Sequence, residues 1–94
     1  MSSPTILGFW FDDDNEEKFG EHGLSAERVD EILDSEYLVL GNRSGRRGHY
    51  LIIGHDRGGT CIATPVEPTQ EPGIWRPITA WRCKEHERRA LEGR

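Results

Sequence analysis

The spacing of apolar residues changes near residue 37 and divides the chain into a helical part and a strand-rich part. The apolar and aromatic run at 6–11 predicts a short first strand. The acidic stretch at 12–14 can cap a helix that follows it, and Asp13 with Glu16 has the spacing of a capping box. Gly23 can end this helix, because glycine tolerates the left-handed conformation.

A second helix is predicted to begin after Ser25, whose hydroxyl can accept a hydrogen bond from the first turn. Apolar residues then recur at helical spacing and form one stripe toward a core, until Asp34 and Ser35 end the pattern. The members of this stripe are Ala26, Val29, Ile32 and Leu33.

Beyond residue 37, short apolar runs alternate with glycine-rich polar separators. This pattern is typical of antiparallel strands that are joined by hairpins. The runs are 37–40, 50–53 and 61–66, and the separators are 41–45 and 56–59.

The last part of the chain predicts a loop, a strand and a helix. Residues 67–73 carry two prolines and are predicted to form the loop. A fourth strand of the group is predicted at 74–81, and because Pro77 lacks an N–H for the ladder, this strand lies at an edge or carries a bulge there. Residues 83–93 are free of glycine and proline until their end and predict a polar C-terminal helix.

Segregated helices and strands predict an α+β fold in a single domain over residues 1–94, with 1–5 as a flexible tail. We expect two N-terminal helices packed on an antiparallel sheet of about four to five strands, plus a C-terminal helix.

Charge is divided unevenly along the 94 residues, of which 34% are hydrophobic and 31% are charged. Residues 12–36 hold eleven acids and two bases, whereas residues 37–94 hold six acids and ten bases. The formal charges are −9 and +4, which together give the net charge of −5. The basic part can meet phosphate or an acidic partner, and two ordinary solvated surfaces are the alternative.

The cysteine, histidine and hydropathy patterns indicate a cytoplasmic protein without a metal site or a membrane helix. Cys61 and Cys83 form no CxxC pair and are interpreted as two buried free residues of a cytoplasmic protein, with a single disulfide as the alternative. The histidines form neither HxxxH nor HExxH, so we expect no metal site and no cofactor. No apolar run approaches the roughly 20 residues of a membrane helix, so no membrane association is expected.

Three segments in a fixed order resemble the BrnT family of bacterial toxin ribonucleases. In the first, residues 9–12 pair aromatic residues with an aspartate, and 21–25 end a helix at a His-Gly pair. The second is the strand start at 48–54. The third, residues 76–82 followed by 87–89, is similar to the closing strand of the family and to a helix with a Glu-Arg pair.

The resemblance implies a RelE-like fold, RNA cleavage without a metal, and a small DNA-binding antitoxin as partner. Such cleavage needs a base for the 2′-hydroxyl, a cation for the charge on the phosphorane and an acid for the leaving oxygen. The candidate catalytic residues are Arg82, Arg76, His49 and Glu87, and the candidate RNA-binding residues are Lys18, His22, Arg88 and Trp81.

Each candidate also has an ordinary structural interpretation. Arg76 and Arg82 share one strand face if no bulge intervenes and can flank a phosphate there, but they can equally pair with acids of the first helix. His22 can compensate the dipole of that helix at its C-terminal end. Glu87 and Arg88 can belong to a solvated helix face.

Two other functions stay open. Trp81 stands where the family has an arginine, and Pro77 replaces an apolar strand residue. With the net acidity, these departures favour a catalytically inactive binding or regulatory module of the same fold that binds a neighbour-encoded protein. A third hypothesis is an unrelated small enzyme that uses His49 or His55, with a closed pocket that has a histidine at its base.

Overall fold

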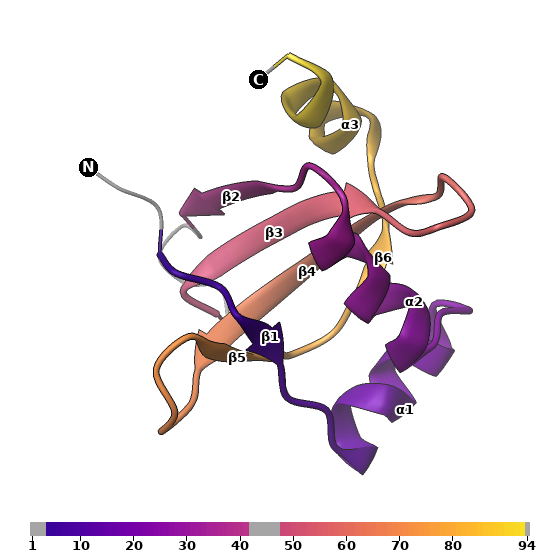
Figure 1. The fold of residues 1–94 in the computed structure, drawn as a ribbon. Helices are drawn as coiled ribbons and strands as arrows, with labels where there is room; N and C mark the ends of the chain where they lie inside the picture. Colours follow the sequence, from indigo (N-terminus) through magenta and orange to yellow (C-terminus); the bar gives the residue numbers. More distant parts are fainter. Residues whose placement is uncertain (1–3, 42–47, 94) are drawn as a thin grey trace.

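A computed structural model describes residues 4–41 and 48–93 of the chain (Figure 1). The N-terminal part contains β1 (Gly8–Phe9), α1 (Asp13–Glu21), α2 (Ala26–Glu31) and the 3-10 helix η1 (Ile32–Asp34). The strand-rich part contains β2 (Leu38–Gly41), β3 (Tyr50–His55), β4 (Cys61–Pro68), β5 (Ile74–Pro77) and β6 (Trp81–Arg82), and α3 (Glu85–Glu92) follows it. Most helices precede most strands, which confirms the α+β class.

The strands form one mixed sheet in the order β1-β5-β4-β3-β2, and β6 also pairs with β4. Neighbouring strands are antiparallel, except that β1 runs parallel to β5. The prediction of a purely antiparallel sheet is therefore wrong at this edge. Because helices and three other strands separate β1 from β5 in sequence, no hairpin joins them and a parallel pairing is possible.

The hairpin of β3 and β4 is confirmed, since these strands pair antiparallel from Tyr50 opposite Val66 to His55 opposite Cys61. β2 also pairs antiparallel with β3. Of the separator predicted at 41–45, only Gly41 is among the described residues.

β5 and β6 pair with the same edge of β4 and carry one extra residue between them. From the pair of Val66 with Pro77 to the pair of Ala63 with Trp81, β4 advances three residues and the opposing chain advances four. An extra residue of this kind is a β-bulge, and it reverses the side-chain alternation beyond it. The single strand predicted at 74–81 is therefore two strands, and the alternative of a bulge near Pro77 is confirmed.

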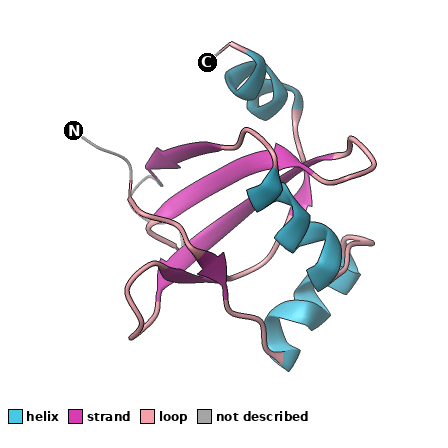
Figure 2. Cartoon of the chain, in the orientation of Figure 1, coloured by secondary structure: helices cyan, strands magenta, loops and turns pink. Residues whose placement is uncertain are grey.

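Two apolar cores lie on opposite faces of the sheet, because strand side chains alternate between the faces. Figure 2 shows α1 and α2 together and α3 apart from them. The larger core packs α1 and α2 against one face and contains Phe19, Leu24, Val29, Ile32, Ile52, Ile62, Val66 and Ala80. The smaller core packs α3 against the other face and contains Ile53, Cys61, Ala63, Cys83 and Leu91.

A buried side chain, Asn15, ties the start of α1 to the sheet. Asp12 is the N-cap, because its carboxylate accepts a hydrogen bond from the Asn15 N–H (2.8 Å) and its own N–H donates to Asn15 Oδ1 (3.0 Å). Asn15 Nδ2 donates to the carbonyl oxygens of Trp10 (3.1 Å) and Pro77 (2.9 Å). The capping box predicted for Asp13 and Glu16 is formed one residue earlier, by Asp12 and Asn15. Only this pair also provides a donor for the carbonyls of Trp10 and Pro77.

The second helix begins as predicted. Ser25 is its N-cap, and the hydroxyl oxygen accepts a hydrogen bond from the Arg28 N–H at 3.2 Å. The hydroxyl of Ser35 donates to the Ile32 carbonyl at 2.7 Å, which closes the last turn of η1. Val29 and Ile32 are fully buried and Ala26 packs against the same core, so these members of the predicted apolar stripe face the sheet, whereas Leu33 is only half-buried.

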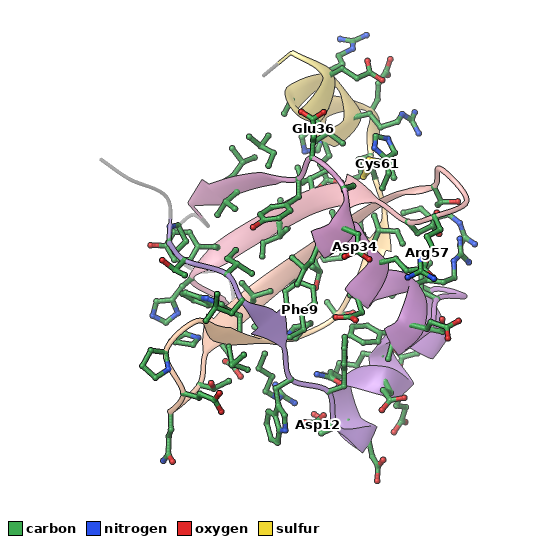
Figure 3. The ribbon with its side chains drawn as sticks, viewed as in Figure 1. Phe9, Asp12, Asp34, Glu36, Arg57 and Cys61 are labelled. Carbon is green, nitrogen blue, oxygen red and sulfur yellow. A yellow bond between two sulfur atoms is a disulfide. The ribbon has the colours of Figure 1, made fainter. Side chains whose placement is uncertain are left out.

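Cys61 and Cys83 are joined by a disulfide, so the prediction of two free cysteines is wrong and its alternative is confirmed (Figure 3). The two Cα atoms lie 5.3 Å apart, because β6 returns alongside β4 and the Cys83 N–H donates to the Cys61 carbonyl at 2.9 Å. The bond fixes the chain to the sheet just before α3 begins.

Replacing Asn15 with alanine is expected to lower the free energy of unfolding by about 2–4 kcal/mol, because the carbonyls of Trp10 and Pro77 lose their donor and the cap loses half its bonds. Urea denaturation measures the change. Glu16→Ala, an exposed neighbour on the same helix, is the control and should change it by less than about 0.5 kcal/mol. Equal losses in both variants would contradict a tie through the amide.

The Cys61→Ala/Cys83→Ala double variant is expected to lose about 2–4 kcal/mol of stability, because the disulfide closes a long loop in the unfolded chain. The separation of the two cysteines is 22 residues. Reduction of the wild-type protein should reproduce the loss in a thermal melt, whereas the reductant should leave the double variant unchanged. Identical melts of oxidised and reduced wild-type protein would refute the prediction.

Candidate functional site

Two of the candidate residues meet where the C-terminal end of α1 contacts β6, and a third lies about one helical turn away. Arg82 Nη1 donates to the carbonyl oxygen of His22 at 2.9 Å. Lys18 precedes His22 by about one helical turn, so the two side chains lie on one face of the helix. His22 and Arg82 are exposed and Lys18 is half-buried. We call Lys18, His22 and Arg82 the Arg82 cluster.

The backbone at the end of α1 lies beside the Arg82 guanidinium. His22 caps α1, and Gly23 follows with a φ of +72°, a conformation that favours glycine. A Cβ at residue 23 would lie 3.4 Å from Arg82 Nη1. Within the described part of the chain, the Arg82 guanidinium makes only the bond to His22, so its other donors are open to an anion.

The Arg76 guanidinium, in contrast, is hydrogen-bonded to carboxylates. Its Nε and Nη2 donate to Asp12 at 2.8 and 3.3 Å, and its Nη1 donates to Glu67 at 3.1 Å. Asp14 lies 3.5 Å from Nη2. The hydrogen bond from Arg76 lowers the pKa of Asp12, and the same bond raises the pKa of Arg76. The charge of this guanidinium is therefore compensated within the protein (Figure 3 labels Asp12 at the start of α1).

The bulge also separates Arg76 from Arg82. Arg76 stands opposite Glu67 of β4, and Arg82 stands opposite Ile62, five residues away. Positions an odd number apart on a strand point to opposite faces. An unbroken strand was the condition for a shared face, and because this condition is not met, the two arginines do not flank one phosphate.

The buried Glu87 and the half-buried Trp81 form a pair that organises the start of α3. Glu87 is 4% exposed and accepts the indole N–H of Trp81 at 3.0 Å and the Lys84 N–H at 2.7 Å. The Lys84 ammonium lies 5.7 Å from the centroid of the Trp81 ring. These contacts hold the helix on the sheet, whereas Arg88 is exposed on the same helix.

The two strand histidines do not meet. The His49 N–H donates to the Val66 carbonyl at one end of β3, and the His55 N–H donates to Ser35 Oγ at the other end. Because Arg82 lies opposite Ile62, His49 is about 13 Å away from it along β4, at roughly 3.3 Å per residue. His49 is therefore too far from the Arg82 cluster to contact it.

A second ion pair, which sequence reasoning missed, joins α2 to the turn between β3 and β4. Asp56 accepts Arg28 Nε at 2.9 Å and the Thr60 N–H at 2.8 Å. Burial raises the pKa of Asp56, but the hydrogen bonds from Thr60 and Arg28 outweigh it and lower the pKa overall. The only signal in the sequence is an aspartate at the start of a glycine-rich turn, which is too common to identify a partner.

A surface groove lies at the opposite end of α1 from the Arg82 cluster. It has a volume of about 450 Å³ and is lined by Trp10, Ile74, Arg76 and the turn residues 68–71. No histidine lines this groove, so it gives no support to an enzyme with a histidine at the base of a pocket. Glu67 and Pro68 belong to β4, so the loop predicted at 67–73 is confirmed only over 69–73, and its role as a wall of the groove was not predicted.

Two features are absent from the described residues. Within residues 4–41 and 48–93, no three His, Cys, Asp or Glu side chains are grouped so that they could hold a metal ion. None of the helices in the same ranges has the length and apolar character that crossing a membrane requires.

Comparison with known proteins found no matching family model and no curated protein of significant similarity.

Loss of the Asp12 charge is expected to weaken the attachment of α1 at low pH. The folded pKa of Asp12 lies below its ordinary value of 3.8, so the folded state holds fewer protons than the unfolded state. This stabilisation is fully present above about pH 5 and is lost as the pH falls through the folded pKa. Asp12→Asn should therefore flatten the acid limb of a plot of unfolding free energy against pH.

The control is Asp13→Asn, which removes an exposed carboxylate from the same turn. It should keep the wild-type slope in urea titrations over the acid range. If both variants kept that slope, the Asp12–Arg76 pair would have no such role.

Proposed function

We propose that this chain is a BrnT-like toxin of RelE-like fold that cleaves RNA without a metal, and that a small DNA-binding antitoxin restrains it. The Arg82 cluster is the observation that supports this most. Arg82 belongs to the third segment of the BrnT resemblance and His22 to the first, and the two residues are 60 positions apart in sequence. The fold brings them into contact and leaves both side chains open to solvent.

Arg82 and His22 each suit one need of metal-free RNA cleavage, and Lys18 suits the binding of the RNA. The planar guanidinium of Arg82 stays charged and can stabilise the phosphorane with two hydrogen bonds. The imidazole of His22 can act as a general base toward the 2′-hydroxyl or as a general acid toward the leaving oxygen. Lys18 can hold a neighbouring phosphate as a point charge.

The other candidates act indirectly in this proposal. Arg76 positions α1 through Asp12, and Glu87 with Trp81 positions α3. Arg88 is exposed and stays a candidate phosphate contact, and no contact links His49 to the cluster. The proposal places the protein in the cytoplasm with its RNA and its antitoxin, where the Cys61–Cys83 disulfide would meet reducing conditions.

A binding module of the same fold, without nuclease activity, is the second candidate. Three of the nominated polar side chains have partners within the protein: Arg76 with acids, and Trp81 with Glu87. The carbonyl end of α1 also disfavours an anion beside His22, and α1 carries exposed acids. This candidate predicts a stable complex with a protein partner and intact RNA.

Arg82→Ala is expected to lower the rate of RNA cleavage by about 100-fold or more, because one fixed donor to a developing charge contributes that much in comparable sites. The assay uses a labelled structured RNA in EDTA. Arg89→Ala is the matched control, since Arg89 is exposed and pairs with Glu85 on α3. It removes the same charge from the opposite side of the sheet and should retain full activity.

Each outcome decides between the two candidates. Cleavage by the wild-type protein and by Arg89→Ala, but not by Arg82→Ala, supports the nuclease and its site. Cleavage by all three proteins removes Arg82 from the site. Intact RNA in every reaction refutes the nuclease and favours the binding module.

A further inference from the structure

Trp10 places an aromatic ring in the groove, and this ring belongs to neither apolar core. The Trp10 side chain is half-exposed, at 52% for the residue, although burial of such a side chain is strongly favourable. Its backbone is nevertheless fixed on both sides: the Trp10 N–H donates to the Trp75 carbonyl at 2.9 Å, and its carbonyl accepts from Asn15. The indole is thus presented to solvent from a rigid backbone.

The opposite wall of the groove is a turn that its own side chains hold in shape. The Thr69 hydroxyl donates to the Ile74 carbonyl at 2.7 Å and accepts the Glu71 N–H at 3.2 Å. The Ile74 N–H donates to the Glu71 carbonyl at 3.1 Å. Gly73 completes the turn with a φ of +86°, and Leu7 lies over it too closely to admit a Cβ. Because the turn is already ordered, binding of a ligand here costs little conformational entropy.

Negative charge is in excess around the groove. Glu71 lines it directly, and Asp12 and Glu67 hold the guanidinium of Arg76, which lines it too. Asp14 adds a fourth carboxylate 3.5 Å from the same guanidinium. One cation therefore stands among four acids, so the field of the groove attracts cations and repels phosphate.

We propose that this groove binds an arginine-containing, extended segment of a partner protein. The arginine guanidinium stacks on the Trp10 ring, where cation–π attraction and planarity favour it over an ammonium, and it pairs with the Glu71 carboxylate. Ile74 and Pro68 offer apolar walls to the neighbouring side chain of the segment. The inference does not depend on the proposed nuclease function, because the groove and the Arg82 cluster lie at opposite ends of α1.

The test uses fluorescence anisotropy with a short fluorescein-labelled peptide of alternating arginine and leucine, at low salt. A peptide with citrulline in place of arginine is the matched control, because it keeps the shape and removes the charge. We expect Trp10→Ala to weaken binding by about tenfold, the equivalent of a partly desolvated cation–π contact. Glu71→Gln should weaken it by about two- to fivefold, as a surface ion pair does.

Glu92→Gln, with the same charge change on α3, should bind the peptide like the wild-type protein. Circular dichroism of each variant checks that it is folded, and Trp10→Phe should keep part of the affinity because it keeps a ring. Equal affinity of Trp10→Ala and the wild-type protein, or of the arginine and citrulline peptides, overturns the proposal.

Two further outcomes assign the groove to another occupant and also overturn the proposal. One is a dimer in sedimentation velocity that Trp10→Ala dissociates, since the groove would then hold a second copy. The other is displacement of the peptide by an RNA whose own binding to the protein is lost in Trp10→Ala. Arg82→Ala should leave peptide binding unchanged, so failure of the nuclease proposal and failure of this one are distinguishable.

Discussion

The buried amide of Asn15 joins three parts of the molecule: the start of α1, the end of β1 and the end of β5. The Asp12–Arg76 pair holds the same end of α1, and few other contacts hold the rest of the helix. The helix has nine residues, too few to be stable alone, and only Asn15 and Phe19 in it are buried. Asn15 fixes one end, the Arg82–His22 bond fixes the other, and Phe19 anchors the middle in the larger core.

The bulge between β5 and β6 decides which side chains reach which face. In an unbroken strand Arg82 would point toward α3, and Trp81 would point toward α1 and α2. The extra residue exchanges them, so that Trp81 joins the smaller core with Glu87 and Arg82 reaches the end of α1. The Arg82 cluster is thus a product of backbone register more than of local composition.

Sequence patterns predicted the helices, most strands and the Ser25 cap, because periodicity and capping are local. They did not predict the parallel β1–β5 pair or the disulfide, which depend on contacts between distant segments. For the site, the family resemblance nominated both His22 and Arg82, but only the fold shows that they touch. The alternative that Arg76 pairs with acids of the first helix is confirmed by Asp12 and Asp14, whereas the pairing with Glu67 of β4 depends on strand register and was not predicted.

The disulfide closes a covalent loop that contains the residues between Cys61 and Cys83. Cys61 and Cys83 stand on either side of the turn that walls the Trp10 groove. A protease that cuts this turn would therefore leave two fragments that stay covalently joined. Such a nicked chain migrates as one species until it is reduced, and it retains α3 and most of the sheet although the groove itself is open.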